Sequence, residues 1–356
     1  MIKRTYLLNM LYITLSSIML ISCQEDENDD PVSVPPDNRV FITNEGPFQN
    51  GSGSLTIYNR ETNEVTNNAF EKVNGFPLGN LVQSVTVHED KAYIVVNNAN
   101  KIEIADKDYL ISLGSIDGIN LPRYFLGVSK DKAYVSSWDN NVYVIDLSTN
   151  SVSASIPTGT GPEKMILAGD EVWVLNQGGF SIDSTIVVIN TTNDELIKKI
   201  QVGDKPTGIV QDEQGLIWVI CSGNGWNGFP GPDDTKGKFV CIDPQDHEIV
   251  KTIEFPTSDS HPEKLIIDNN GQTVYFNYPG GLYSQNLNEA SLELKIVLAS
   301  QTMYYGLGFD PETGSVFATD PIDYVQNGKV YIINPTGEEI LISFDAGVIP
   351  GEMYFN

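Results

Sequence analysis

The sequence predicts an all-β fold, a seven-bladed β-propeller of four-stranded antiparallel blades, and three observations predict it. Short apolar strands rich in β-branched and aromatic residues follow one another, with small polar turns between them. One four-strand unit recurs along the chain at spacings typical of propeller blades. The first and last parts of the repeat region are each incomplete, and together they make one blade.

The chain begins with a segment that lies outside this fold. Two basic residues precede an apolar stretch from Tyr6 to Ile21, which ends in the sequence LISC at Cys23. This pattern predicts a secretory signal peptide over residues 1–22. A transmembrane anchor is the alternative, but an apolar run of about 16 residues is short for one. The LISC sequence resembles the lipobox of bacterial lipoproteins, which implies that Cys23 becomes the lipidated first residue.

Residues 23–38 read QEDENDDPVSVPPDN after the cysteine, an acidic and proline-containing stretch without hydrophobic periodicity. Such a stretch cannot bury a core, so we expect a flexible tether; a merely solubilising tail is the alternative. The acidic residues directly after Cys23 resemble the signal that exports lipoproteins to the outer face of the outer membrane. The resemblance implies a lipid-anchored protein of the outer membrane that faces the cell exterior.

Composition excludes one class of partner. The chain has 47 acidic and 21 basic residues, a formal net charge of −26. A chain this acidic repels phosphate backbones, so no nucleic acid is expected as a partner. Charged residues make up only 19% and apolar residues 40% of the sequence, which indicates a globular protein. The repeats indicate that residues 39–356 form one domain.

The repeat is clearest in the second strand of each unit. One full unit runs from Arg123 to Gly159 and contains four strands joined by short turns. Its second strand occurs seven times in the sequence, this unit included, which predicts seven blades. These strands begin at Arg39, Lys91, Lys132, Glu171, Leu216, Thr273 and Ser315.

The two ends of the repeat region predict how the ring closes. The repeats start at Arg39 on a second strand, with no first strand before it. Residues 353–356 form a first strand with no second strand after it. We therefore expect the C-terminal strand to join the N-terminal blade, because closure leaves no unpaired edge between the first and last blades.

The repeats also carry a family resemblance. The stretch VYVIDLSTNSVSASIPTG resembles the YVTN-type repeat of surface-layer and YncE-like propellers, and it recurs as VVINTTNDELIKKIQVG and VCIDPQDHEIVKTIEF. This resemblance covers residues 39–356 and implies the propeller fold. It says almost nothing about function, because propellers carry many unrelated activities.

Signatures of catalysis are sparse. The chain lacks the GxSxG, HExxH and phosphate-binding loop patterns. Its three histidines, His88, His247 and His261, fall at two different ends of the blades, and we interpret each as a solvated turn residue. Neither a metal site nor a catalytic residue is predicted, and we expect a binding protein without a cofactor. A propeller hydrolase or lyase stays an open alternative.

Two cysteines lie on neighbouring strands of the fifth blade. If the turn in WDNNVY is centred on Asn140 and Asn141, the aligned positions of Cys221 and Cys241 lie directly opposite each other. That spacing permits a disulfide in an oxidising compartment. Two buried free thiols are the alternative.

Irregular loops and exposed aromatic residues are predicted on one face of the ring. Connections between second and third strands share this face, here called the loop face, with the links between blades. The opposite face, the turn face, carries short charged turns. The longest connection on the loop face is residues 222–238, with a Trp, a Phe and five Gly. Clustered aromatic residues on loops of a rigid scaffold predict a ligand-binding surface. The expected ligand-binding residues, chosen by loop position, are Phe48, Arg123, Trp138, Phe180, Trp226, Phe229, Tyr278, Tyr304, Tyr305 and Tyr324.

A closer resemblance adds a ligand. The stretches VFITNEGPFQNGSGSL, VNGFPLGNLVQS, NLPRY, IDYVQNGKVY and GVIPGEMYF resemble the seven-bladed surface lipoproteins that capture cobalamin, vitamin B12. The resemblance implies that this chain captures cobalamin or another corrinoid and delivers it to a TonB-dependent outer-membrane transporter, with membrane contact through the lipid anchor only. A surface-layer-type adhesion propeller that binds glycan or protein is the alternative.

Overall fold

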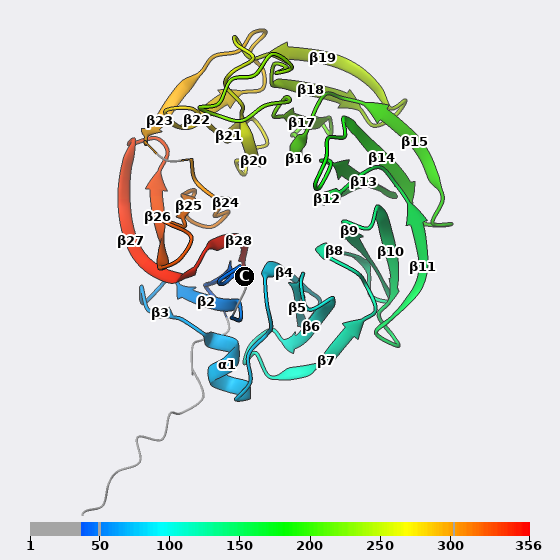
Figure 1. The fold of residues 1–356 in the computed structure, drawn as a ribbon, viewed down its shortest axis with the longest axis vertical. Helices are drawn as coiled ribbons and strands as arrows, with labels where there is room; N and C mark the ends of the chain where they lie inside the picture. The colour runs from blue at the N-terminus through cyan, green and yellow to red at the C-terminus, as the bar shows by residue number, and fades with distance from the viewer. Residues whose placement is uncertain (1–36, 49–50, 302) are drawn as a thin grey trace, which may run out of the picture. The chain divides into compact units, whose positions relative to one another are not determined.

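The computed structural model describes residues 37–48, 51–301 and 303–356. The predicted signal peptide, Cys23 and nearly all of the tether lie outside the described residues. The described chain forms seven four-stranded antiparallel sheets arranged in a ring, which confirms the predicted propeller (Figure 1). Within these residues, none of the helical structure is long and apolar enough to cross a membrane.

Each sheet is one blade, with its first strand nearest the axis of the ring (Figure 1). From the innermost strand outwards, the first four blades are β28 (Pro350–Phe355), β1 (Arg39–Asn44), β2 (Ser54–Asn59) and β3 (Val65–Thr66); β4 (Val82–His88), β5 (Lys91–Val96), β6 (Lys101–Asp106) and β7 (Ser112–Asp117); β8 (Pro122–Ser129), β9 (Lys132–Ser137), β10 (Asn141–Asp146) and β11 (Ser151–Pro157); and β12 (Pro162–Ala168), β13 (Glu171–Asn176), β14 (Thr185–Asn190) and β15 (Leu196–Gln201). The last three are β16 (Pro206–Gln211), β17 (Ile217–Cys221), β18 (Lys238–Asp243) and β19 (Glu248–Glu254); β20 (Glu263–Ile267), β21 (Thr273–Tyr278), β22 (Gly281–Asn286) and β23 (Lys295–Ala299); and β24 (Gly306–Phe309), β25 (Val316–Asp320), β26 (Asn327–Asn334) and β27 (Glu339–Val348).

The core lies between the faces of neighbouring blades. Trp173 and Leu175 on β13 pack in one cluster with Val219 on β17 of the next blade, and all three are fully buried. The second and third strands are covered by a blade on each side, so both of their faces are apolar. Their sequences therefore read as continuous apolar runs, whereas the outer strands are largely exposed.

The ring closes as the sequence predicts. Strand β28 pairs antiparallel with β1, with Val40 opposite Phe355 and Ile42 opposite Met353. The C-terminus thus supplies the innermost strand of the blade whose other three strands come from the N-terminal part of the repeat region. This pairing joins the first and last blades without a free edge.

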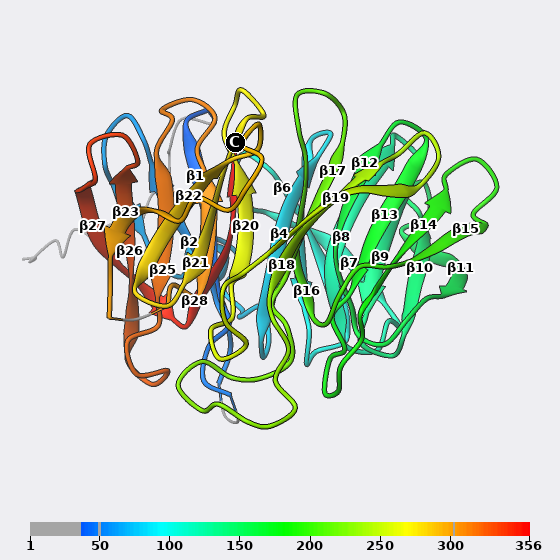
Figure 2. The same ribbon diagram turned by 90° about the horizontal axis from the view of Figure 1, so that it is seen from above.

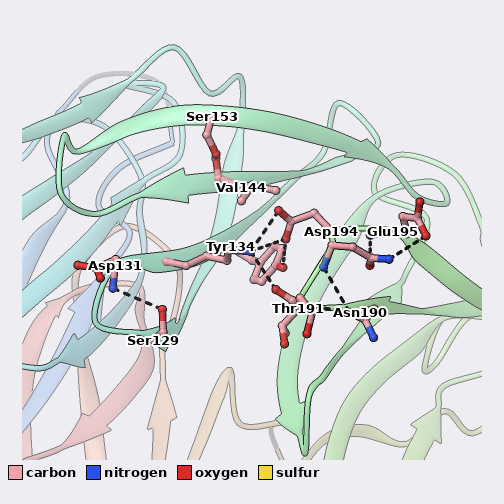
Figure 3. A network of polar contacts seen from close by, with 12 residues as sticks. Ser129, Asp131, Tyr134, Val144, Ser153, Asn190, Thr191, Asp194 and Glu195 are labelled. Atoms are coloured by element: carbon pink, nitrogen blue, oxygen red, sulfur yellow. Dashed lines mark hydrogen bonds and ion pairs between the residues drawn. The ribbon is translucent and has the colours of Figure 1, made fainter.

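Polar contacts also join neighbouring blades on the turn face. Lys132 at the start of β9 lies 2.9 Å from Asp194, in the β14–β15 turn of the next blade, and the Tyr134 hydroxyl donates to the same carboxylate (Figure 3). Burial and this hydrogen bond raise the pKa of Tyr134. The equivalent position one blade later is Glu171, which lies 3.0 Å from His247 in the β18–β19 turn. A repeated position thus places the same kind of contact at successive blade interfaces.

The first blade departs from the predicted repeat. Its outer strand β3 is only two residues long, and a short helix, α1 (Ala69–Asn74), follows in the link to the next blade. Ala69 and Phe70 of this helix are buried between the two blades, and Gly75 ends it at φ 73°, a conformation that favours glycine. The helix covers core that a longer outer strand covers in the other blades.

The register prediction for the two cysteines is wrong. Cys221 lies opposite Lys238, and Cys241 lies opposite Trp218. In the template blade Ser137 pairs with Asn141, so the connection has three residues, whereas the prediction centred a two-residue turn on Asn140 and Asn141. The pairing differs by three residues from the predicted one, an odd number, which places the two cysteines on opposite faces of the blade. Both are buried free thiols.

Candidate functional site

The site is built by an irregularity that recurs at the start of the inner strands. Strands β4, β8, β12, β16, β20 and β28 each have one extra residue relative to their partner near their first residue. Such β-bulges turn side chains out of the regular alternation. In these strands the bulge falls at the loop-face end of the axis. It therefore directs the residues after the first position toward one central space.

That space is a cavity of about 430 Å³ on the axis of the ring. Its wall is made mostly of residues from the starts of the inner strands, together with aromatic residues from the loops. The lining includes Glu45, Gln83, Arg123, Tyr124, Trp138, Glu163, Lys164, Gln177, Thr207, Trp226, Glu263, Lys264, Met303, Tyr304, Tyr305, Tyr324 and Glu352. Cavities of a few hundred Å³ that combine aromatic surface with a few polar groups are typical ligand sites.

Arg123 organises one side of this cavity. Its guanidinium lies 3.0 Å from the Glu163 carboxylate and 4.0 Å from the centre of the Trp138 ring, and it also donates to the side-chain oxygen of Gln83. The indole N–H of Trp138 donates to Glu163 at 2.7 Å. Each of these side chains therefore fixes its neighbour, and the group forms a rigid wall whose charges are already paired.

Glu352 organises a second group of charges in this cavity. Its carboxylate lies 2.9 Å from Lys164 and 3.7 Å from Lys264, and it accepts a hydrogen bond from the Tyr124 hydroxyl at 3.2 Å. Burial acts to raise the pKa of Glu352, but the two lysines and the hydrogen bonds outweigh it and lower the pKa to about 2. Glu352 is therefore ionised and links three inner strands to the closing strand β28.

A second cavity, of about 730 Å³, lies beneath the loop of residues 222–237, which projects from the loop face between β17 and β18 (Figure 2). It shares Gln177, Thr207, Trp226 and Glu263 with the axial cavity, so the two spaces adjoin. Trp226 is exposed over 74% of its surface, and Lys205 lies 4.9 Å from the centre of its ring.

His261 fixes this loop from below. Its backbone N–H donates to the Asn227 side chain at 2.8 Å, and its Nδ1 lies 3.0 Å from the carbonyl oxygen of Ser222. Gly225 passes so close that a Cβ there would lie 2.4 Å from Nε2, and its φ of 129° also favours glycine. The prediction that His261 is a solvated turn residue is therefore wrong: it is 1% exposed and lines the second cavity.

The structure divides the predicted aromatic residues into three groups. Those that line a cavity, together with Arg123, are Trp138, Phe180, Trp226, Tyr304, Tyr305 and Tyr324. Phe48 and Phe229 are on the loop face, 74% and 80% exposed, but they line neither cavity. Tyr278 is 8% exposed and packs between Phe255 and Tyr283 in the core of its blade.

The residues that sequence reasoning missed are the polar ones at the starts of the inner strands. A signal for them is present, because the triplet Pro-Glu-Lys occurs at 162–164 and again at 262–264, one hundred residues apart. Arg123 and Thr207 likewise follow a proline at the start of an inner strand. The residue after this proline lies in the bulge of β8, β12 and β16 and directly before the bulge of β20, and in each of these four strands it lines the axial cavity.

The site offers a ligand aromatic surface and hydrogen-bonding groups. In the part of the chain that the structure describes, no three His, Cys, Asp or Glu side chains are grouped so that they could hold a metal ion. Among the residues that the structure describes, Glu263 makes neither a hydrogen bond nor an ion pair, and burial raises its pKa against the opposing effect of Lys264 and Lys205. The site thus contains paired charges, which shape it, and polar groups that have no hydrogen-bond partner within the described residues.

Comparisons with known proteins identify a family and a fold. A family model described as "Domain of unknown function (DUF5074)" matches residues 38–344. No curated protein matches the sequence.

Among solved structures, a quinonprotein alcohol dehydrogenase-like protein from Bacteroides thetaiotaomicron gives a TM-score of 0.65 at 13% identity, covering 91% of this chain and 79% of that chain. A periplasmic gluconolactonase from Pseudomonas aeruginosa gives 0.65 at 12% identity, with 89% and 99% covered. A functionally unknown protein from Desulfotomaculum acetoxidans gives 0.67 at 10% identity, with 89% and 98% covered. At these identities the likeness shows the fold alone.

Proposed function

The chain belongs to the DUF5074 family, whose description names no function, and we propose that its propeller is a binding protein that captures cobalamin or another corrinoid at the loop face. The observation that carries the proposal is the pair of adjoining cavities, lined by aromatic side chains and by polar groups without partners. A corrinoid is a wide macrocycle with apolar faces and an amide-bearing rim, so it needs both kinds of surface in one place.

The geometry favours a broad ligand over a small one. Each cavity alone has the volume of a typical site for a drug-sized molecule, and the two adjoin at Thr207, Glu263 and Trp226. A ligand that spans both cavities contacts four or more blades at once. Phe180 and Trp226 then provide exposed aromatic surface at the rim, at low cost in side-chain entropy.

We also propose that the protein is anchored through Cys23 to the outer membrane and delivers its ligand to a TonB-dependent transporter. Strand β1 runs from the turn face to the loop face, so the tether joins the propeller on the side opposite to the cavities. Sixteen tether residues extend over at most about 55 Å. A six-residue strand, which runs from the turn face to the loop face, is about 20 Å long, so the tether reaches more than twice that distance. This reach allows the loop face to turn toward a transporter in the same membrane.

Isothermal titration calorimetry of residues 37–356 with cyanocobalamin tests the binding function. Micromolar or tighter binding with a stoichiometry of about one, together with a rise in melting temperature from binding to the folded state, supports the proposal. If micromolar cyanocobalamin produces no heat of binding and no shift in melting temperature, the corrinoid assignment is refuted.

Lactone hydrolysis is a second candidate, because one observation favours it. Glu263 presents an unpaired carboxylate in a cavity, and its raised pKa is what a general base requires. A solved structure with this fold is a gluconolactonase. Hydrolysis of gluconolactone by the wild type above the spontaneous rate, abolished in Glu263→Gln, supports this function; a rate equal to the background in both proteins refutes it.

A further inference from the structure

The wall between the two cavities holds polar groups that have no partner. Within the described residues, the hydroxyl of Thr207 is buried and makes no hydrogen bond. The carboxylate of Glu263, a partly buried residue, has neither a hydrogen bond nor an ion pair there. Both side chains line both cavities. A buried polar group without a partner destabilises the protein, so a ligand that satisfies it gains affinity.

His261 adds a third unpartnered group, and its geometry defines the group's chemistry. Nδ1 lies 3.0 Å from the carbonyl oxygen of Ser222, which only accepts, so in the neutral ring Nδ1 carries the proton and donates. Nε2 is then an acceptor, and it is buried without a partner among the described residues, in a side chain that is 1% exposed and lines the second cavity.

The unpartnered groups of this wall are therefore mainly acceptors: a carboxylate, an imidazole nitrogen and a hydroxyl. The nearby cations are Lys205 and Lys264, and both have partners. The Lys205 Nζ donates to the carbonyl oxygen of Gly225 at 3.1 Å and lies over the ring of Trp226, so its charge serves to hold the loop. The Lys264 Nζ lies 3.7 Å from the carboxylate of Glu352. A ligand group that fits this wall supplies N–H or O–H hydrogens and carries no negative charge.

We infer that Thr207, His261 and Glu263 form a subsite for a neutral hydrogen-bond donor of the ligand, and that the subsite rejects a carboxylate at the same position. The inference rests on the proposed corrinoid function, in which the donor is a primary amide of the corrinoid rim. A primary amide donates two hydrogens, whereas a carboxylate donates none and is repelled by Glu263. A nearby like charge costs about one pKa unit or more, which is about tenfold in affinity.

Selectivity between amide and acid tests this inference. The probes are cyanocobalamin and its three monocarboxylic acids, in each of which one propionamide is hydrolysed to a propionate. The proteins are the wild type, Glu263→Gln, Thr207→Val and the control Glu289→Gln, which removes one charge from an exposed turn on the opposite face. Melting temperatures establish that each variant is folded.

We expect the wild type and Glu289→Gln to bind at least one acid about tenfold or more weakly than cyanocobalamin, and Glu263→Gln to bind the two within about threefold. Thr207→Val should weaken cyanocobalamin without removing the selectivity. Equal affinity for cyanocobalamin and all three acids in the wild type overturns the inference, as does tighter binding of an acid, which would make Lys205 the recognition group. If the wild type does not bind cyanocobalamin at all, the proposed function fails and the inference fails with it.

Discussion

The closing strand β28 carries a largely buried charge, the carboxylate of Glu352. Glu352 on β28 contacts Lys164 of β12, Lys264 of β20 and Tyr124 of β8, so one carboxylate ties together four inner strands. Replacing Glu352 by Gln removes this charge and keeps the shape of the side chain. We predict that Glu352→Gln destabilises the folded ring near neutral pH and that the loss disappears in acid.

The magnitude follows from the pKa of Glu352. Burial opposes ionisation, yet Lys164, Lys264 and the hydrogen bonds outweigh it and lower the pKa from the ordinary 4.5 to about 2. A carboxyl group whose pKa is lower in the folded state stabilises that state above pH 4.5, and the contribution is lost as the pH falls from 4.5 to about 2. At about 1.4 kcal/mol for each pKa unit, the contribution near neutral pH is about 3 kcal/mol. The side chain is only 13% exposed, so screening by solvent is limited.

Urea unfolding of the wild type, Glu352→Gln and Glu289→Gln, repeated from about pH 6.5 down to about pH 2.5, measures this contribution. The other carboxyl groups titrate equally in all three proteins, so the difference between wild type and variant isolates Glu352. We expect a gap of about 3 kcal/mol at the upper end that closes steadily toward the lower end, and no gap for Glu289→Gln. A gap that stays constant over the whole range, or is absent near neutral pH, would refute the charged network around Glu352.

Three further predictions follow from the fold and the anchor. Deleting residues 347–356 exposes two blade edges and should lower the free energy of unfolding by several kcal/mol, because burial of apolar surface contributes about 25 cal/mol per Å². An unchanged melting temperature would contradict the predicted ring closure. Burial raises the pKa of Cys221 and Cys241 to about 12, so a thiol-reactive chromophore should label neither cysteine in the folded domain. After denaturation without reductant it should label both, whereas a disulfide would leave both unlabelled. Cys23→Ala should move the protein from the membrane fraction to the soluble fraction, and retention in the membrane would indicate an uncleaved anchor.

The propeller was predictable because its signal is repeated. Each second strand, such as β13 or β17, is an apolar run because its blade is covered by a neighbouring blade on both faces. Seven such runs predict the propeller even if one of them is assigned incorrectly. Details that occur once were not predictable. The helix α1 replaces part of one outer strand. The predicted pairing of Cys221 rests on a template blade whose connection has three residues instead of the two that the prediction assumes, and in the structure Cys221 pairs with Lys238. A sequence pattern fixes strand identity far better than register.

The candidate site was predictable only in part, for a related reason. Loop position identified Trp138, Trp226 and Tyr305, which do line the cavities. It failed for Tyr278, which ends a strand and is covered by Phe255. The charged half of the site depends on bulges that turn residues such as those of the two Pro-Glu-Lys triplets toward the axis, and alternation along a regular strand does not reveal a bulge.

The measurement that tests the central proposal most directly is the affinity of cyanocobalamin for the wild type, Trp226→Ala and Phe229→Ala. Both aromatic side chains are exposed on the same loop, but only Trp226 lines the cavities, so each variant controls for the other. We predict that Trp226→Ala weakens binding about thirtyfold, the usual effect of about 2 kcal/mol for an aromatic anchor, while Phe229→Ala stays within about threefold and both keep the wild-type melting temperature. Wild-type affinity in Trp226→Ala would place the ligand outside these cavities and contradict the account.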